Sequence, residues 1–297
     1  TVSGQPHITK FWKSTGWKGD GTVPTWAVVY QFQRQGIYAA DWGFSQHGPF
    51  VLITDYGSKA SVSGDEYARY CYLSKDYGKT WQTIFDLATV TTGIGVHMHG
   101  ACFDPYWNRI WVSFGDGSFG KNGLFYSDDL GATWVWALQT NTAGINFSQS
   151  VNIVALPTCI LFASDSYPNG IQRIDRAQGR TPTAGYYTVD SAWMIPDQPA
   201  SLAYLFQQVA RSEWFPDAPY LFVYSAENVA GKSGVVATFD GWSFDQIWIS
   251  DANNTAGYGG RSVMGVTPTN EVVIGSFDSS NPPETPWEKI TLKVNLD

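Results

Sequence analysis

An eight-residue pattern that occurs twice constrains the fold of this chain more than any other feature. Residues 74–81 and 127–134 both read Ser-x-Asp-x-Gly-x-Thr-Trp, and each copy follows a short apolar segment with strand character. The glycines, Gly78 and Gly131, can adopt a positive φ, and the aspartate two residues earlier can accept hydrogen bonds from the amides of the turn. Each copy therefore predicts a β-hairpin turn whose Thr and Trp begin the return strand.

A longer pattern recurs five times along the chain. It consists of a small or polar strand, a turn with proline, a β-rich strand and an acidic residue, while helical periodicity is nearly absent. The acidic ends follow one another at intervals of about 50 to 60 residues, a period that fits one blade of a β-propeller. Their regularity predicts turn capping and argues against a single active site. These residues are Asp55, Asp116, Asp165, Glu227 and Asp278.

The eight-residue turn resembles the Asp-box of BNR repeats in sialidase-like β-propellers. The resemblance implies an all-β chain that forms a single β-propeller domain over residues 1–297, with repeats at 34–90, 91–144, 145–203, 204–258 and 259–297. We expect five blades of about four antiparallel strands each, with residues 1–33 closing the ring through a strand at 25–32. The alternative is six blades, one of them built from residues 1–30 around a decayed turn at 14–17.

Charge and cysteine content narrow the expected partners and location. A formal net charge of −8 with few charged residues disfavours a phosphate-binding surface, so we expect no nucleic-acid partner. No apolar run approaches the length of a membrane span, and no membrane insertion is expected. Cys71, Cys102 and Cys159 lie in apolar segments, which predicts buried free thiols. We expect an extracellular or virion-surface protein, such as a phage tail protein, that can assemble into a larger particle.

Polar residues on the first strand of each repeat form the candidate binding site, because these strands line the central channel of a propeller. His97 and His99 alternate along one strand and therefore share a face. A water-filled channel lined by polar side chains is the structural alternative. We expect no cofactor and no metal; the alternative is a metal held by the two histidines and Asp41. The complete candidate site is Asp41, His97, His99, Gln149, Gln208 and Arg261.

The sequence leaves enzyme and binding module open. Sialidases carry an Arg-Ile-Pro motif, whereas the nearest strings here begin at Arg109 and Arg173, and a third channel arginine is missing, so sialidase activity is disfavoured. A glycan- or receptor-recognition module displayed on a virion tail or cell surface is expected, because aromatic residues make up 16% of the chain and can stack on sugars. The alternatives are a glycoside hydrolase or polysaccharide lyase, or a propeller that only mediates assembly.

Overall fold

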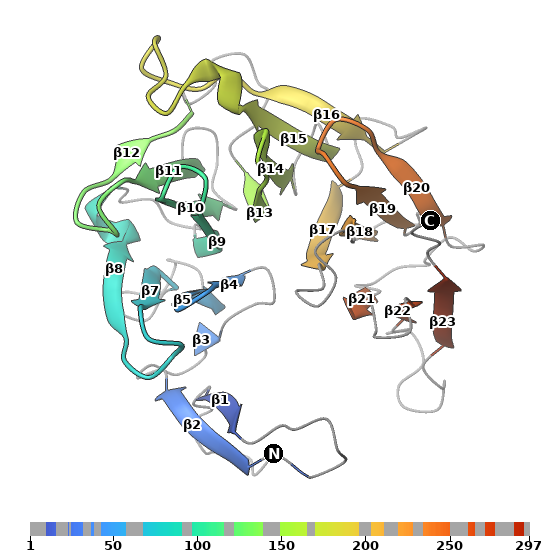
Figure 1. Ribbon diagram of the computed structural model, residues 1–297, viewed down its shortest axis with the longest axis horizontal. Coiled ribbons are helices and arrows are strands. Elements are labelled where there is room, and N and C mark those ends of the chain that lie inside the picture. The colour runs from blue at the N-terminus through green and yellow to red at the C-terminus, as the bar shows by residue number, and fades with distance from the viewer. Residues whose placement is uncertain are drawn as a thin grey trace. The chain divides into compact units, whose positions relative to one another are not determined.

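The computed structural model describes the chain in segments that fall into two compact units, Thr1–Val135 and Trp136–Asp297. Each unit is described separately below (Figure 1). Within the described ranges, none of the helices has the length and apolar character of a membrane-spanning segment. The described residues are 10–15, 23, 25–31, 37–38, 43–57, 68–90, 97–115, 122–138, 149–164, 170–195, 203–210, 219–227, 234–249, 261–264, 271–276 and 288–293.

The first unit is built from antiparallel strands joined by short connections. Two four-stranded sheets have the orders β4-β5-β7-β8 and β12-β11-β10-β9, and two smaller sheets pair β1 with β2 and β3 with β6. The strands are β1 (Lys10–Thr15), β2 (Thr25–Gln31), β3 (Ile37–Tyr38), β4 (Phe44–His47), β5 (Phe50–Thr54), β6 (Tyr56–Gly57), β7 (Tyr70–Ser74), β8 (Gln82–Asp86), β9 (His97–Asp104), β10 (Arg109–Gly115), β11 (Gly123–Ser127) and β12 (Val135–Trp136), and a 3-10 turn, η2 (Leu87–Thr89), follows β8.

The second unit repeats the same plan with two four-stranded sheets and one of three strands, in the orders β13-β14-β15-β16, β17-β18-β19-β20 and β21-β22-β23. The elements are β13 (Ser150–Ala155), β14 (Cys159–Ser164), β15 (Gly170–Asp175), η3 (Arg176–Gln178), β16 (Asp190–Met194), β17 (Ala203–Ala210), β18 (Tyr220–Glu227), β19 (Gly234–Thr238), β20 (Asp245–Ile249), β21 (Arg261–Met264), β22 (Glu271–Ser276) and β23 (Glu288–Lys293). The chain is thus all-β, as predicted from the near absence of helical periodicity.

All five predicted pairs of first and second strands are present: β4 with β5, β9 with β10, β13 with β14, β17 with β18, and β21 with β22. The first repeat differs in detail from the prediction, because its first strand is divided. Ile37 and Tyr38 pair with β6, whereas β4 begins only at Phe44. Among the second strands, β5, β10 and β14 are almost completely buried, as their continuous apolar sequences require.

An apolar core lies between two sheets of the second unit, and alternate residues of their strands form it. On β14, the alternating side chains of Cys159, Leu161 and Ala163 face those of Phe222 and Tyr224 on β18, and all five are at most 1% exposed.

The three cysteines of the chain are free and buried, which confirms the prediction made for them. Burial raises the pKa of the Cys159 thiol, which keeps it protonated and unreactive.

The first acidic end has the capping role that was predicted. Asp55 is fully buried, and its Oδ2 atom accepts hydrogen bonds from the backbone amides of Arg69 and Tyr70 at 3.3 and 3.1 Å. These bonds fix the chain as it enters β7. Asp116, Asp165 and Asp278 lie outside the described residues, and only the backbone of Glu227 is described, so capping at these four positions stays a prediction.

The two repeated turns have nearly the same hydrogen bonds. In the first, the Ser74 hydroxyl donates to Asp76 Oδ1 at 2.8 Å and accepts from the amide of Gly78, also at 2.8 Å. Asp76 also accepts from the amide and the hydroxyl of Thr80 at 2.8 and 2.7 Å. In the second turn, the residues at the same positions make the same four bonds at distances between 2.6 and 2.8 Å. The Ser, Asp, Gly and Thr of the pattern are therefore all required by the turn itself.

Both turns contain two consecutive residues with positive φ. Gly78 has a φ of 80° and Gly131 of 95°, as the pattern predicts, but Tyr77 and Leu130 before them also lie at 60° and 57°. A left-handed backbone at a non-glycine residue costs of the order of 1–2 kcal/mol. The hydrogen bonds to the Ser and Asp side chains offset this cost.

The turns also join neighbouring sheets, which the sequence did not predict. A Cβ atom at Gly131 would come within 2.5 Å of the Ile84 Cβ atom on β8, so only glycine allows this approach. Beside it, the indole Nε1 of Trp134 donates to the Ile84 carbonyl at 2.8 Å. The second turn therefore fastens its own sheet to the outer strand of the preceding sheet.

A shortened form of the repeated turn, Thr-Phe-Asp-Gly-Trp at residues 238–242, makes the same kind of joint in the second unit. Its Gly241 has a φ of 76°, and a Cβ atom there would meet Cys159 Sγ at 2.5 Å. The Thr158 hydroxyl donates to the Asp240 carbonyl at 3.0 Å, and the Arg173 guanidinium lies 3.6 Å from the ring centroid of Trp242. As in the first unit, the turn contacts the sheet that precedes its own in the chain.

The first turn contacts the β1–β2 hairpin in the same way. Lys13 Nζ donates to the Tyr77 carbonyl at 2.6 Å, and the rings of Tyr30 and Trp81 lie 5.5 Å apart. Residues 25–32 were predicted to close the last blade. Residues 25–31 do form a strand, β2, but within the described residues it pairs with β1. Pairing across a short connection costs less loop entropy than pairing with the far end of the chain. Ring closure through β2 is therefore not confirmed.

The two turn aspartates should make stability sensitive to acid. Hydrogen bonds from the Thr80 amide and hydroxyl lower the pKa of Asp76 to about 2, and those from Thr133 lower the pKa of Asp129 to about 2. An aspartate whose pKa is lower in the folded than in the unfolded state stabilises the folded protein at pH values above the unfolded-state pKa. This contribution to stability is lost as the pH falls from about 4 to about 2. We expect the double variant Asp76→Asn with Asp129→Asn to melt at a lower temperature at pH 7 and to lose less stability over that pH interval.

Melting curves followed by circular dichroism between pH 7 and pH 2 measure this difference. The exposed neighbour Lys75 provides a control, since Lys75→Gln should not change the stability that is lost between about pH 4 and pH 2. If the aspartate variant loses as much stability over this interval as the wild type, the prediction is contradicted.

Candidate functional site

The six predicted site residues are described to different extents. His97 and His99 are described fully, on β9 of the first unit. Gln149 is half-buried immediately before β13. Only the backbone is described for Gln208, on β17, and for Arg261, which begins β21. Asp41 lies outside the described residues.

If the six residues line one channel at the same level, each should lie at a similar distance from the acidic end of its repeat. The strand registers test this. His97 lies opposite Gly115, one residue before the acidic end of its repeat, and Arg261 lies opposite Ser276, two residues before the end of its own. Gln208 lies opposite Val223, four residues before the acidic end, and is therefore further along its strand than the others. The convergence of all six side chains stays a prediction.

The two histidines and Tyr56 form one aromatic cluster in the first unit. The ring centroids of His97 and His99 lie 5.1 Å apart, which confirms that both side chains are on one face of β9. The ring of Tyr56, on β6, lies 4.2 Å from that of His97 and 6.4 Å from that of His99. Sequence reasoning missed Tyr56, because β6 has only two residues and carries no alternation pattern.

A bulge in β9 and a close backbone approach position this cluster. Ser113 is where the register between β9 and β10 shifts, and its hydroxyl accepts from the Gly100 amide at 3.0 Å. On the other side, the Thr54 hydroxyl donates to the carbonyl of His99. Gly43 contacts the same Thr54 hydroxyl, which a Cβ atom at Gly43 would meet at 2.3 Å. The backbone of β9 is thus held from both sides near His99.

Burial limits what the His-Tyr cluster can do. His97 and His99 are each 1% exposed, so a substrate cannot reach their imidazoles in this structure. Within the described ranges, no three or more His, Cys, Asp or Glu side chains lie together as a metal site requires. The third ligand considered for such a site, Asp41, is outside those ranges. The described geometry is that of packed aromatic and imidazole rings.

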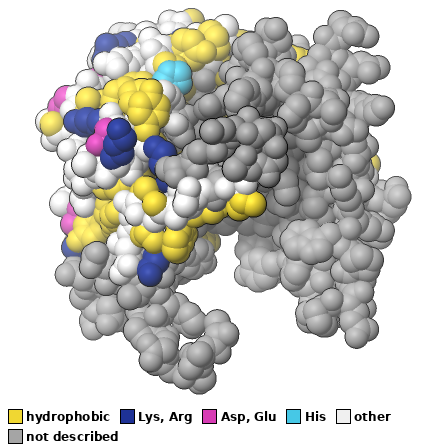
Figure 2. All heavy atoms as spheres, turned by 60° about the horizontal axis from the view of Figure 1, so that its bottom comes forward, with side chains coloured by type: hydrophobic (Ala, Val, Ile, Leu, Met, Phe, Trp, Pro, Cys, Tyr) yellow, Lys and Arg dark blue, Asp and Glu magenta, His cyan; other side chains and the backbone are white. Residues whose placement is uncertain are grey.

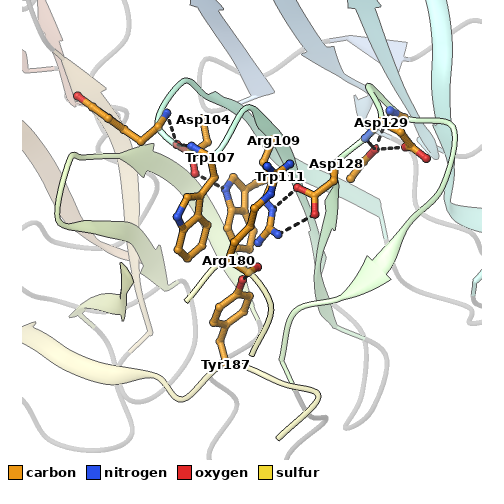
Figure 3. A network of polar contacts seen from close by, with 11 residues as sticks. Asp104, Trp107, Arg109, Trp111, Asp128, Asp129, Arg180 and Tyr187 are labelled. Atoms are coloured by element: carbon orange, nitrogen blue, oxygen red, sulfur yellow. Dashed lines mark hydrogen bonds and ion pairs between the residues drawn. The ribbon is translucent and has the colours of Figure 1, made fainter. Parts of the chain in front are cut away.

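A second polar cluster surrounds Arg109, whose side chain is fully buried (Figure 3). Its Nε and Nη2 atoms donate to the two carboxylate oxygens of Asp128 at 2.8 and 2.9 Å, which is a bidentate ion pair. Asp128 occupies a variable position of the second repeated turn, and its side chain is 38% exposed. The turn therefore supplies the counter-ion of a buried arginine.

Aromatic rings enclose the same guanidinium. Its Cζ atom lies 3.7 Å from the ring centroid of Tyr126, 4.9 Å from that of Trp107 and 5.2 Å from that of Trp111. Asp104 holds two of these groups, since its carboxylate accepts from the Trp107 amide and from the Trp111 indole, each at 3.3 Å (Figure 3). Arg109 begins one of the two strings nearest to Arg-Ile-Pro, yet its guanidinium is bound to Asp128 and enclosed by these rings. It is not available to bind a substrate carboxylate.

Several large apolar side chains are exposed instead of buried. Trp12 and Trp26 are 55% and 56% exposed, and both lie on the β1–β2 hairpin. The other exposed aromatic residues among those described are Phe44, Tyr77, Tyr106, Tyr186, Phe239 and Trp242. His97 and His99 are thus buried, whereas aromatic rings that could bind a ligand are at the surface.

Comparison with known proteins relates the chain to solved structures only. It is similar to the GH74 enzyme of Niastella koreensis, with 18% identity and a TM-score of 0.53 over 86% of this chain and 38% of that enzyme. It also matches the GH74 xyloglucanase from Xanthomonas campestris (14% identity, TM-score 0.49, 87% of this chain and 37% of that one) and the intramolecular trans-sialidase from Ruminococcus gnavus (16%, 0.42, 98% and 60%). No protein-family model and no curated protein matches.

The likeness to the Niastella koreensis enzyme bears on the fold. It supports a propeller-like arrangement of four-stranded antiparallel sheets, in agreement with the strand orders described above. The chain spans well under half of the length of that enzyme. Activity does not follow from a fold shared at this level of identity.

Proposed function

We propose that this protein is a carbohydrate-recognition module, displayed on a virion tail or a cell surface, that binds glycans without cleaving them. The observation that carries the proposal is the exposure of Trp12 and Trp26, each more than half open to solvent. Burying a large aromatic side chain is favourable, so two indoles left open on one hairpin call for an explanation. The electron-rich face of an indole attracts the C–H groups of a sugar ring, and binding of a glycan supplies that explanation.

Burial of the histidines supports recognition over catalysis. General acid or base catalysis requires a group within hydrogen-bond reach of the substrate. His97 and His99, each 1% exposed, do not meet this requirement in the structure. Arg109 is likewise engaged by Asp128, which supports the expectation that the protein is not a sialidase.

A carbohydrate-active enzyme, either a glycoside hydrolase or a polysaccharide lyase, is the second candidate. The observation that favours it is the contact of two imidazoles with the Tyr56 ring, since these groups could transfer protons if a substrate reached them. A GH74 enzyme, from Niastella koreensis, has a similar fold at a TM-score of 0.53.

Our proposal also covers the number of blades and the nature of the repeated turns. We infer five blades whose repeated turns are Asp-boxes, supported by the five strand pairs and by the shared hydrogen bonds of the two turns. Six blades, with the β1–β2 hairpin as part of the sixth, is the alternative. The three buried free thiols fit folding in a reducing compartment, so the proposal is a protein that folds in the cytoplasm and is displayed afterwards, as virion proteins are.

A glycan-binding screen followed by product analysis tests the proposed function. The purified protein is screened on a glycan array, and each bound glycan is then incubated with the protein and examined by mass spectrometry. We expect binding without product. A water-added product would establish a hydrolase and a 4,5-unsaturated product a lyase, and either would contradict the proposal.

His97 variants separate the two candidate functions. We expect His97→Ala and His97→Asn to bind glycan as the wild type does, because the imidazole is buried away from ligand. Circular dichroism shows whether each variant is folded, and the asparagine variant preserves polarity if the alanine variant does not fold. Wild-type turnover that disappears in a folded His97 variant would assign the cluster to catalysis.

A further inference from the structure

The β1–β2 hairpin has two chemically different faces, which its register defines. Across the two strands, Phe11 lies opposite Tyr30, whereas Trp12 lies opposite Val28 and Ser14 opposite Trp26. Side chains alternate along β1, and the register between the strands shifts by one residue between Phe11 and Trp12, so that Phe11 and Tyr30 share one face and the two tryptophans share the other. The second face, which we call the hairpin platform, consists of Lys10, Trp12, Ser14, Trp26, Val28 and Gln31.

The inner face of the hairpin is already occupied. Phe11 and Tyr30 pack against a buried cluster in the first four-stranded sheet that includes Ile53 and Tyr72. The Tyr30 and Tyr72 rings lie 5.1 Å apart. The hairpin is thus fixed by one face, and the platform necessarily points outward.

The platform is apolar at its centre and exposed. Trp12, Trp26 and Val28 have 55%, 56% and 42% of their surface open. Since Trp12 lies opposite Val28, Trp26 is its diagonal neighbour, at a Cα separation of about 7–8 Å. Figure 2 turns the end of the molecule that carries this hairpin toward the viewer and shows exposed hydrophobic side chains on the described surface. The register thus places two exposed indoles on the same face of the hairpin as diagonal neighbours.

We propose that the hairpin platform is the sugar-binding surface of this protein and that it takes a linear oligosaccharide of at least two pyranose rings, one on each indole. The inference rests on the proposed function. Around the two tryptophans lie hydrogen-bonding groups of three kinds, from Lys10, Ser14 and Gln31, which suit the hydroxyl edges of a sugar.

Charge favours a neutral or carboxylate-bearing sugar. Neither strand of the hairpin contains an Asp or Glu, although the chain as a whole has a formal net charge of −8. Lys10 lies on the platform itself, opposite Gln31. An oligosaccharide that carries carboxylates therefore meets a locally basic surface, and a cationic partner is disfavoured.

The size of the platform argues against a second copy of the chain as the occupant. It comprises six side chains, whereas a stable protein–protein interface takes about 20–30 residues from each partner. A two-fold dimer through this face would also bring Lys10 of both copies to the same surface. A sugar of two or three rings matches the area that is available.

Binding of the full chain to linear oligosaccharides of two to six pyranose units, half of them neutral and half uronate-bearing, tests the platform. We expect Trp12→Ala and Trp26→Ala each to weaken binding about 3- to 10-fold, and the double variant to weaken it by more than tenfold. Lys10→Gln should weaken only the uronate-bearing ligands. Phe239→Ala removes a ring that is 60% exposed in the other unit and should leave every affinity unchanged.

The outcomes separate the platform from the proposed function. If the wild type binds and both tryptophan variants bind equally well, the platform assignment is overturned and the proposed function stands. If the wild type binds none of these oligosaccharides and no glycan of the wider array, both are overturned. If the tryptophan variants instead convert a dimer to a monomer in light scattering, the platform is a self-association surface. Because Trp12 and Trp26 point outward, the variants should fold, and circular dichroism verifies this.

Discussion

Deleting residues 1–33 should abolish the cooperative melting of the first unit. The deletion removes Phe11 and Tyr30, and so uncovers Ile53 and Ala68, which are both fully buried. Loss of a fully buried aromatic side chain costs about 3–5 kcal/mol, and although these two rings are only half-buried, their combined loss is large compared with the stability of a typical domain. The Lys13 bond to the first repeated turn is lost as well.

Differential scanning calorimetry of the truncated and full chains measures this effect. Deletion of residues 1–9 alone is the control, since it leaves both strands of the hairpin in place, and we expect it to melt like the full chain. The point variant Tyr30→Ala should give an intermediate result. A chain without residues 1–33 that melts like the full chain would show that the hairpin adds nothing to the core.

Replacing Asp128 with alanine should destabilise the protein by about 2–3 kcal/mol. Breaking a buried ion pair leaves an uncompensated charge, at a usual cost of 3–5 kcal/mol. Here the guanidinium of Arg109 is fully buried but the Asp128 side chain is 38% exposed, so water can partly compensate and the cost is smaller. Trp107 and Trp111 contact the guanidinium, so they contribute to the fluorescence change on unfolding together with the other tryptophans of the 14 in the chain.

Urea unfolding followed by tryptophan fluorescence measures the loss. The matched control is Asp190→Ala, in which the aspartate is 55% exposed and lies 3.8 Å from Arg173, so that its loss should cost about 0–1 kcal/mol. The double variant Asp128→Ala with Arg109→Met should recover part of the stability, because it removes the unpaired charge. Equal small losses for Asp128→Ala and Asp190→Ala would mean that the buried guanidinium does not need its counter-ion.

Local features of the fold were predicted correctly from the sequence. The repeated turns, the five strand pairs and the buried thiols each depend on residues close together in the chain or on simple alternation. Turn chemistry is of this kind: the hydroxyl of Ser74 and the carboxylate of Asp76 find their donors within four residues. Such features need no knowledge of how the sheets pack.

Features that depend on distant partners were missed. Alternation placed His97 and His99 on one face, but it could not say that this face is closed to solvent. The counter-ion of Arg109 is 19 residues away, at a position of the turn that the pattern leaves variable. Residues 25–31 were recognised as a strand, but hydrophobicity alone does not determine which strand is its partner.

The direction of the joints between sheets has a consequence for biosynthesis. Each repeated or shortened turn contacts an element that comes earlier in the chain: the first turn contacts the hairpin, the second contacts β8, and the third contacts β14. A sheet that emerges from the ribosome therefore finds its docking surface already synthesised within the same unit. Within each unit, the joined sheets can therefore assemble in the order in which they are synthesised. Such an order keeps the amount of uncovered sheet small during translation, when aggregation is most dangerous for a β-rich chain.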